Sequence, residues 1–305
     1  MNQDAVLAVA LPLTLFLMMF GMGANLSPGD FRRLLAHPSS ILYGLASQML
    51  LLPCLAFMLL SILALPPEIT IGFMILALSP GGTTSNVFSY LAGGNLALSI
   101  ALTAIVSLIT PVSLPLVAGW VMDSRLAGES EIALPFLPTV GKLAAITLVP
   151  VMLGMILRHY RRGFCERNEF WMTRLPFLML LCVIAGIIAQ NWADMPGFFA
   201  LTAFPALLLA SVALLMGYTF ARVMRCAARD ARTIAIETAI QNGGTAILVT
   251  GTILGNSAMT IAPVMYGILM LLPVMGYLVG LRLWRMRRCG RKSDRSCSVS
   301  GHSGQ

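Results

Sequence analysis

Nine long apolar stretches alternate with short polar ones along the chain. They cover about residues 5–25, 39–63, 69–91, 95–121, 138–157, 175–191, 198–221, 233–254 and 258–281. A helix needs roughly 20 apolar residues to cross the hydrocarbon core of a bilayer. The strands of a membrane barrel would instead alternate in segments of about ten residues. The pattern therefore predicts an all-α polytopic membrane protein with about nine transmembrane helices.

Composition excludes a soluble fold of this size. Charged residues make up 10% of the 305 residues and apolar residues 58%, whereas charged residues are about 25% of an ordinary globular protein. The mean hydropathy is +0.85. The net charge of +8 does not indicate nucleic-acid binding, because no basic segment carries the interleaved aromatic residues of such a surface.

The distribution of Lys and Arg predicts the orientation. With the N-terminus outside and the C-terminus in the cytoplasm, eighteen of the 20 basic residues fall in inner loops or the C-terminal tail. The positive-inside rule favours this arrangement, in the inner membrane of a bacterium. We read the first stretch as a retained span, since no small-residue cleavage site follows it. Residues 1–289 are expected to form one transmembrane domain, and residues 290–305 a disordered polar tail.

Six cysteines show no Cys-X-X-Cys pair and no regular spacing. Cys54 and Cys182 lie in apolar stretches, where a cysteine usually acts as a small hydrophobic residue. The others lie in basic segments that we place in a reducing cytoplasm. We therefore expect neither a disulfide framework nor a zinc site.

Glu237 is the one carboxylate in the middle of an apolar stretch. Burying a charged side chain there costs roughly 2.5–3.5 kcal/mol on insertion scales. No Lys, Arg or His lies at a similar depth in any predicted span. Gln241 follows four residues later, on the same helix face. A bound cation would supply the missing positive charge, so the pattern favours a cation site.

Two predicted spans contain helix-breaking sequences. In the third, the expected break covers residues 79–86, where Ser-Pro-Gly-Gly precedes Thr83, Thr84, Ser85 and Asn86. In the eighth, Asn242 is followed by two glycines. Broken helices at membrane depth are tolerated where they line a cavity, and corresponding breaks in two halves of a chain point to a transporter built from inverted repeats.

Further oxygen-bearing side chains lie in neighbouring spans. Ser99 and Thr103 share one face of the fourth span, and Gln48 lies in the second. Hydroxyl groups in membrane helices often hold helices together. Beside a carboxylate, however, they complete a set of oxygen ligands that suits Na⁺ rather than a soft metal.

These motifs resemble the bile acid:sodium symporter family. The resemblance rests on Pro-Gly-Gly-X-X-Ser-Asn at residues 80–86, Tyr-Leu-Ala-X-Gly-Asn-X-Ala-Leu-Ser at residues 90–99, and Glu-X-X-X-Gln-Asn at residues 237–242. Phe-Gly-Met-Gly from Phe20, Asp-Phe-Arg from Asp30, Gln48 and Pro53 are similar to an earlier family block. The likeness extends from about residue 12 to 284. Many bacterial members have ten spans, so this chain resembles the nine-span form.

The resemblance implies two crossing discontinuous helices, with spans 2–4 and 7–9 as a core domain and spans 1, 5 and 6 as a panel domain. It implies two sodium ions as co-substrates. The first would be bound by Ser85, Asn86, Ser99, Thr103 and Glu237. The second would be bound by Gln48, Glu237, Gln241 and the carbonyls of Thr238 and Ile240. Thr83, Thr84 and Asn242 would contact the substrate.

The resemblance also implies sodium-driven import of an organic anion by alternating access. The cargo would be a small carboxylate, such as pantoate or ketopantoate, or a molecule like a bile acid. A proton-coupled or sodium-independent carrier remains an alternative, because Glu237 could bind a proton. An arsenite-type exporter is a weaker one, because residues 79–86 contain no cysteine.

Enzymatic activity is not expected. His37, His159 and His302 lie outside the predicted spans and form no HExxH motif, which a zinc protease would need. An intramembrane aspartyl enzyme would need two membrane carboxylates. Beyond its substrate and the surrounding lipid, the sequence indicates no nucleic-acid or obligate protein partner.

Overall fold

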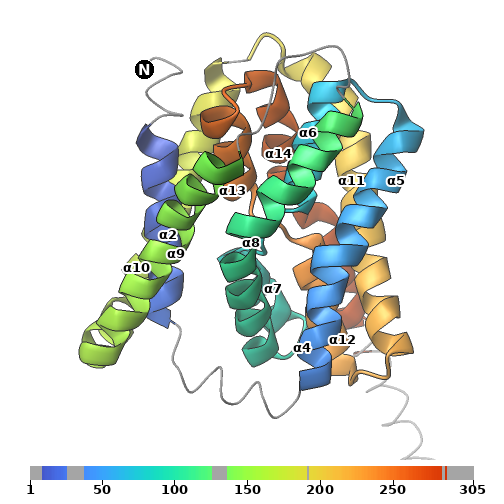
Figure 1. Ribbon diagram of the computed structural model, residues 1–305. Coiled ribbons are helices and arrows are strands. Elements are labelled where there is room, and N and C mark those ends of the chain that lie inside the picture. The colour runs from blue at the N-terminus through green and yellow to red at the C-terminus, as the bar shows by residue number, and fades with distance from the viewer. Residues whose placement is uncertain (1–8, 26–37, 126–135, 191, 284–285, 287–305) are drawn as a thin grey trace, which may run out of the picture.

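The computed structural model describes residues 9–25, 38–125, 136–190, 192–283 and 286, and every named element within them is a helix (Figure 1). The polar tail and the loop with Arg32 and Arg33 lie outside the described residues. The N-terminal helices are α2 (Leu11–Asn25), α4 (Pro38–Ala46), the π-helical turn η2 (Ser47–Leu51), α5 (Leu52–Leu63), α6 (Pro67–Ala77), α7 (Thr83–Leu91) and α8 (Leu96–Arg125). The others are α9 (Phe136–Tyr160), α10 (Arg162–Gln190), α11 (Met195–Val223), α12 (Ala228–Ala239), α13 (Gly243–Ile247), the π-helical turn η3 (Leu248–Ile253) and α14 (Ser257–Leu269).

Among the described residues, six helices are long and apolar enough to cross a membrane. They cover Pro38–Leu63, Leu96–Met122, Leu137–Tyr160, Arg162–Ala189, Met195–Val223 and Ser257–Leu283. Shorter apolar helices cover Leu11–Asn25, Pro67–Ala77 and Gly243–Ile253. The described part of the chain is thus the helical bundle of a polytopic membrane protein, which confirms the predicted class. The count of nine spans stays a prediction.

The helices pack into two neighbouring groups. In the first, α2 packs along α9 and α10 (Figure 1). A Cβ atom on Gly23 would overlap the Val151 carbonyl, and one on Gly154 would overlap the Phe20 carbonyl. Small residues therefore let α2 and α9 approach closely. In the second group, α12 packs against α11, α7 and α8, and α14 packs against α6, α11 and α13.

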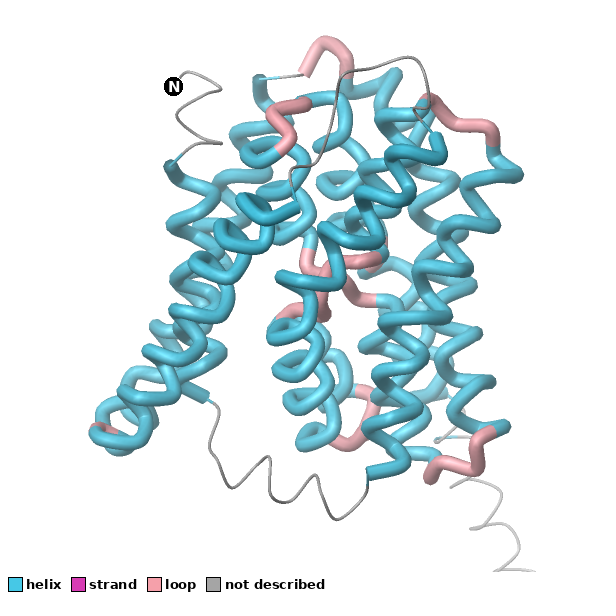
Figure 2. Tube along the Cα trace, in the orientation of Figure 1, coloured by secondary structure: helices cyan, strands magenta, loops and turns pink. Residues whose placement is uncertain are grey.

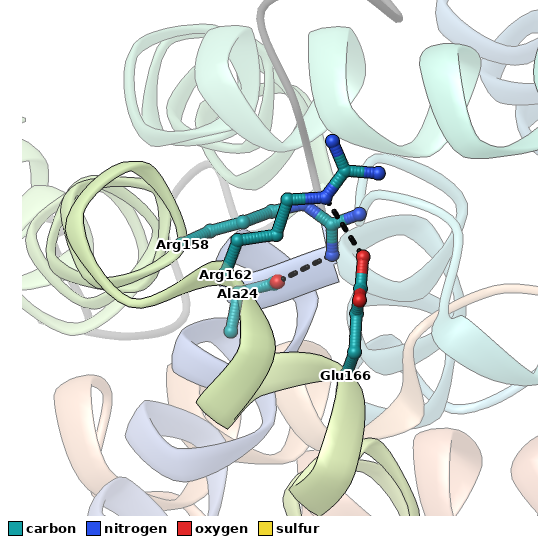
Figure 3. Close-up of polar contacts among 4 residues, drawn as sticks. All are labelled: Ala24, Arg158, Arg162 and Glu166. Carbon is teal, nitrogen blue, oxygen red and sulfur yellow. Dashed lines mark hydrogen bonds and ion pairs between the residues drawn. The ribbon is translucent and has the colours of Figure 1, made fainter.

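The junction of α9 and α10 differs from the sequence expectation. We expected residues 158–174 to form a cytoplasmic loop, but only Arg161 separates the two helices. Arg162 Nε donates to Glu166 Oε1 at 2.8 Å, four residues later, and Arg158 donates to the Ala24 carbonyl at 2.9 Å (Figure 3). Polar residues with partners at i,i+4 continue a helix outside the hydrocarbon, so α10 extends well beyond its apolar part.

Two interrupted helices meet at their breaks. One break separates α6 from α7, and the other separates α12 from α13. Gly81 and Gln241 form an isolated antiparallel bridge, and Asn242 N–H donates to the Pro80 carbonyl at 2.8 Å. Figure 2 shows these loop segments at mid-height in the bundle. Each break thus supplies hydrogen-bond partners for backbone groups that the other break leaves free. Non-helical backbone at membrane depth needs such partners, because no water is available there.

Candidate ion and substrate site

The carboxylate of Glu237 is buried where α12 faces α7 and α8, with 1% of the residue exposed. Ser85 Oγ donates to Oε1 at 2.7 Å and Thr103 Oγ1 donates to Oε2 at 2.9 Å. Ser99 Oγ also donates to Oε1. The one ion pair found in the described part of the chain joins Arg162 and Glu166. Within that part, Glu237 is therefore held by hydroxyl groups and has no cationic partner.

When Glu237 is ionised, the cluster around it contains more acceptor oxygens than protons. Ser85 Oγ lies 2.6 Å from the Gly82 carbonyl as well as beside Glu237. Ser99 Oγ likewise lies 2.8 Å from Asn86 Oδ1. Because a hydroxyl has one proton, neither serine can satisfy both of its acceptors. Lone pairs that converge without enough protons are suited to a hard cation such as Na⁺.

A second group of polar atoms lies beside Glu237, around Gly81. A Cβ atom on Gly81 would lie 2.7 Å from Glu237 Oε2, 3.2 Å from Gln48 Nε2 and 3.4 Å from Thr103 Oγ1. Gln48 lies in the π-helical turn η2, a feature often found at functional sites. Both polar atoms of its amide are buried without a hydrogen-bond partner. A buried unpaired amide is costly, so Gln48 is a candidate ligand.

The end of α12 supplies the remaining predicted ion ligands. Gln241 Nε2 donates to the carbonyls of Glu237 and Thr238 at 3.1 and 3.0 Å, while Gln241 Oε1 is buried without a partner. Ile240 has an extended backbone and ends the helix. The Thr238 carbonyl thus already accepts one hydrogen bond, while the Gln241 side-chain oxygen accepts none.

Two of the three predicted substrate residues line one cavity. Thr84 and Asn242 contribute to a space of about 180 Å³, together with apolar residues of α2, α10 and α14. Asn242 Oδ1 accepts from Thr245 N–H at 3.2 Å and caps α13. This leaves Asn242 Nδ2 buried without a partner. Thr83 begins α7, but its side chain lies outside the described residues.

Sequence reasoning missed several residues that support the site. Tyr266 of α14 donates to the Ala239 carbonyl at 2.8 Å and so satisfies the end of α12. Ser47 Oγ pairs with Thr238 Oγ1 at 2.8 Å and joins η2 to α12. A buried tyrosine usually finds a partner for its hydroxyl, so a Tyr within an apolar span was the available signal for Tyr266.

Comparisons with known proteins identify the family. The model of the Sodium Bile acid symporter family matches residues 12–195. The chain belongs to the sodium bile acid symporter family. This confirms the resemblance, and because the family and its members are transporters, it also confirms that the protein is not an enzyme.

Individual relatives support the same assignment. The chain is 30% identical to the uncharacterized sodium-dependent transporter YocS of Bacillus subtilis (strain 168) over 76% of its length and 71% of that protein. It is 27% identical to the ileal sodium/bile acid cotransporter of Oryctolagus cuniculus, over 78% and 68%. Identity to the probable sodium/metabolite cotransporter BASS1 of Arabidopsis thaliana is 29%, over 78% of this chain but 58% of that one. The relatives in this family are thus named as sodium-dependent transporters of differing cargo.

Proposed function

We propose that the protein is a symporter that uses the sodium gradient to import a small organic anion by alternating access. The observation that carries this proposal is the buried Glu237 carboxylate, which accepts from hydroxyls of α7 and α8 without a described cationic partner. A bound cation offsets such a charge, and its release on the other side of the membrane is a natural transport step.

Two sodium ions fit the available oxygens as two sites that share Glu237. The first site is composed of Ser85, Asn86, Ser99, Thr103 and Glu237. The second is composed of Gln48, Glu237, Gln241 and the carbonyls of Thr238 and Ile240. The unpartnered amide of Gln48 and the unpartnered Oε1 of Gln241 support the second site, because both side-chain oxygens are free to bind a Na⁺ ion.

The cavity at the breaks is suited to a small substrate with a negative charge, held by Thr83, Thr84 and Asn242. Its volume of about 180 Å³ lies below the roughly 300–1,000 Å³ of pockets for drug-sized ligands. Its described lining contains no charged residue, so neutral donors such as Asn242 Nδ2 would hold a carboxylate. A small acid of the pantoate or ketopantoate kind fits this space better than a bile acid does.

Alternating access would use the two helix groups. We assign α2, α9 and α10 to the panel domain and the remaining helices to the core, in a nine-span chain of inverted repeats. The N-terminus would lie outside and the C-terminus in the cytoplasm of a bacterial cell. Movement of the panel along the core would expose the cavity at the breaks to each side in turn.

Uptake into proteoliposomes tests this function. A panel of radiolabelled small organic acids is offered with an inward sodium gradient, an inward proton gradient or neither. We expect accumulation with the sodium gradient in the wild type and its loss in Glu237→Gln, which keeps the side-chain shape but removes the charge. Accumulation by Glu237→Gln with wild-type sodium dependence would exclude the mechanism. Accumulation that follows the proton gradient alone would establish a proton-coupled carrier instead.

A further inference from the structure

A second layer of polar side chains lies one helical turn from the Glu237 cluster. In each of three segments, a polar residue of the cluster has a polar neighbour four positions away. The pairs are Ser85 and Ser89 on α7, Asn95 and Ser99 at the start of α8, and Thr233 and Glu237 on α12. Since residues four apart lie on one helix face, the second layer comes directly below the first on all three segments.

The residues of the second layer contact one another. Ser89 Oγ and Thr233 Oγ1 are 2.8 Å apart, and Asn95 N–H donates to Thr233 Oγ1 at 2.8 Å. Ser89 and Thr233 are fully buried. Hydroxyl pairs of this kind often only hold helices together. Here the pair belongs to a row of polar side chains that leads to the buried carboxylate of Glu237.

The column continues to an open cavity at the ends of the helices. Asp230, one turn below Thr233 on α12, accepts from Asn95 Nδ2 at 2.9 Å and from Ser40 Oγ at 2.7 Å. These three residues line a cavity of about 680 Å³, where α4, the α7–α8 turn and the α11–α12 turn converge (Figure 1). From Asp230 to Glu237 the rise along α12 is roughly 10 Å.

Gly94 lies where the column meets this cavity. A Cβ atom there would lie 2.8 Å from Ser89 Oγ and 3.0 Å from the Ser89 carbonyl, and would overlap Thr233 Oγ1. A side chain at this position would therefore press on the hydroxyl pair. Gly94 and Asn95 both line the cavity, so the second polar layer borders it directly.

We propose that this polar column, the three pairs together with Asp230, is the route by which Na⁺ passes between the Glu237 site and the cytoplasm. The inference rests on the proposed sodium site and orientation. The proposed ion route is separate from the substrate cavity. The cavity at Thr84 and Asn242 shares no lining residue with the cavity at Asp230. Oxygen atoms along the column replace water around the ion, as polar groups do in membrane ion paths.

Charge at the mouth gives Asp230 a defined role. Arg225 and Arg229 line the same cavity, and Asp230 is the one acidic residue among its described lining residues. A cation that crosses this mouth is repelled by the arginines and attracted by Asp230. Replacing Asp230 by Asn leaves only the repulsion, which should slow passage about tenfold for a unit charge within several ångströms.

Kinetics distinguish a path residue from a ligand. A higher barrier slows binding and release by the same factor and leaves the equilibrium constant unchanged. Full-length protein in lipid nanodiscs is loaded with radiolabelled Na⁺ and diluted into sodium-free buffer. Asp230→Asn should release Na⁺ about tenfold more slowly than wild type and bind it with nearly unchanged affinity. Asp194→Asn, an exposed carboxylate before α11, should match the wild type in both.

A charge rescue excludes a merely structural effect of losing the bonds to Ser40 and Asn95. Adding Arg229→Gln to Asp230→Asn should restore most of the release rate. Release at the wild-type rate in Asp230→Asn, a change in affinity as large as the change in rate, or failure of the rescue would each overturn the proposed route. Normal sodium affinity in Glu237→Gln would instead show that the proposed function itself is wrong, so the two failures are separable.

Discussion

At the residue scale, the chemistry depends on which polar atoms have partners and which do not. The Asn242 side chain illustrates this, because its oxygen caps α13 while its Nδ2 is buried without an acceptor. A donor left unpaired inside the protein costs about 1–3 kcal/mol. A substrate carboxylate at Asn242 would remove that cost, which is why we assign Asn242 to the substrate and Glu237 to the ions.

Asn242→Ala should therefore weaken substrate binding more than sodium binding. The change removes one donor to the anion and one helix cap. We expect substrate affinity to fall about ten- to 150-fold, since a charge-assisted bond contributes roughly 1.5–3 kcal/mol. Isothermal titration with substrate at saturating sodium, and with sodium alone, measures the two affinities. Equal losses in both titrations would contradict this division of roles.

Gly81→Ala should damage the sodium site although it leaves every ligand in place. The new Cβ atom would lie 2.7 Å from Glu237 Oε2, so the carboxylate must move from its hydroxyl partners. We expect sodium affinity to fall at least tenfold, a loss of about 1.4 kcal/mol, in equilibrium binding without substrate. Gly82→Ala is the matched control, because apart from its two chain neighbours the nearest atom to the new Cβ would be Thr84 N, at 3.9 Å. Similar losses in both variants would refute the steric explanation.

At the element scale, the sequence located both helix breaks but not their extent. We expected the polar residues after Pro80 to belong to the broken segment, yet α7 begins at Thr83. We also expected the two glycines after Asn242 to weaken the helix, yet they form the first turn of α13 beneath the Asn242 cap. The Asn242 side chain caps the start of α13, whereas α7 begins after Gly82 without a side-chain cap. Each unwound segment is therefore shorter than its composition suggested.

Ala64 allows a test of backbone conformation at the end of α5. Its φ of 47° and ψ of 46° lie in the left-handed region, which costs a non-glycine residue roughly 1–2 kcal/mol. Ala64→Gly should raise the midpoint of thermal unfolding in detergent. Ala46→Gly is the control, because Ala46 has the helical φ of −60° and ψ of −41°. This substitution should reduce the free energy of unfolding by about 1 kcal/mol and so lower the midpoint. A decrease in both variants would contradict the strain at Ala64.

At the scale of the whole molecule, transport should move charge. Two Na⁺ ions with a monovalent anion carry one net positive charge inward, and each elementary charge gains about 2.3 kcal/mol per 100 mV. An inside-negative potential of about 100 mV should raise accumulation in proteoliposomes by roughly fiftyfold. Potassium gradients with valinomycin set the potential. Uptake that is indifferent to the potential would indicate one Na⁺ per monovalent anion and remove the second site.

The sequence by itself determined the membrane class, the orientation hypothesis, the two breaks and the importance of Glu237. These follow from local properties: apolar length, the cost of a membrane charge, and the backbone preferences of Pro and Gly. The tertiary structure decided which groups meet. Ser85, Ser99 and Thr103 reach Glu237 across 152, 138 and 134 residues of chain, and Gly81 pairs with Gln241. No local pattern encodes such contacts, because they depend on how α7, α8 and α12 pack. The polar layer leading to Asp230 is likewise visible only in the packed structure. In the sequence, each of its residues is an ordinary polar residue near a helix end.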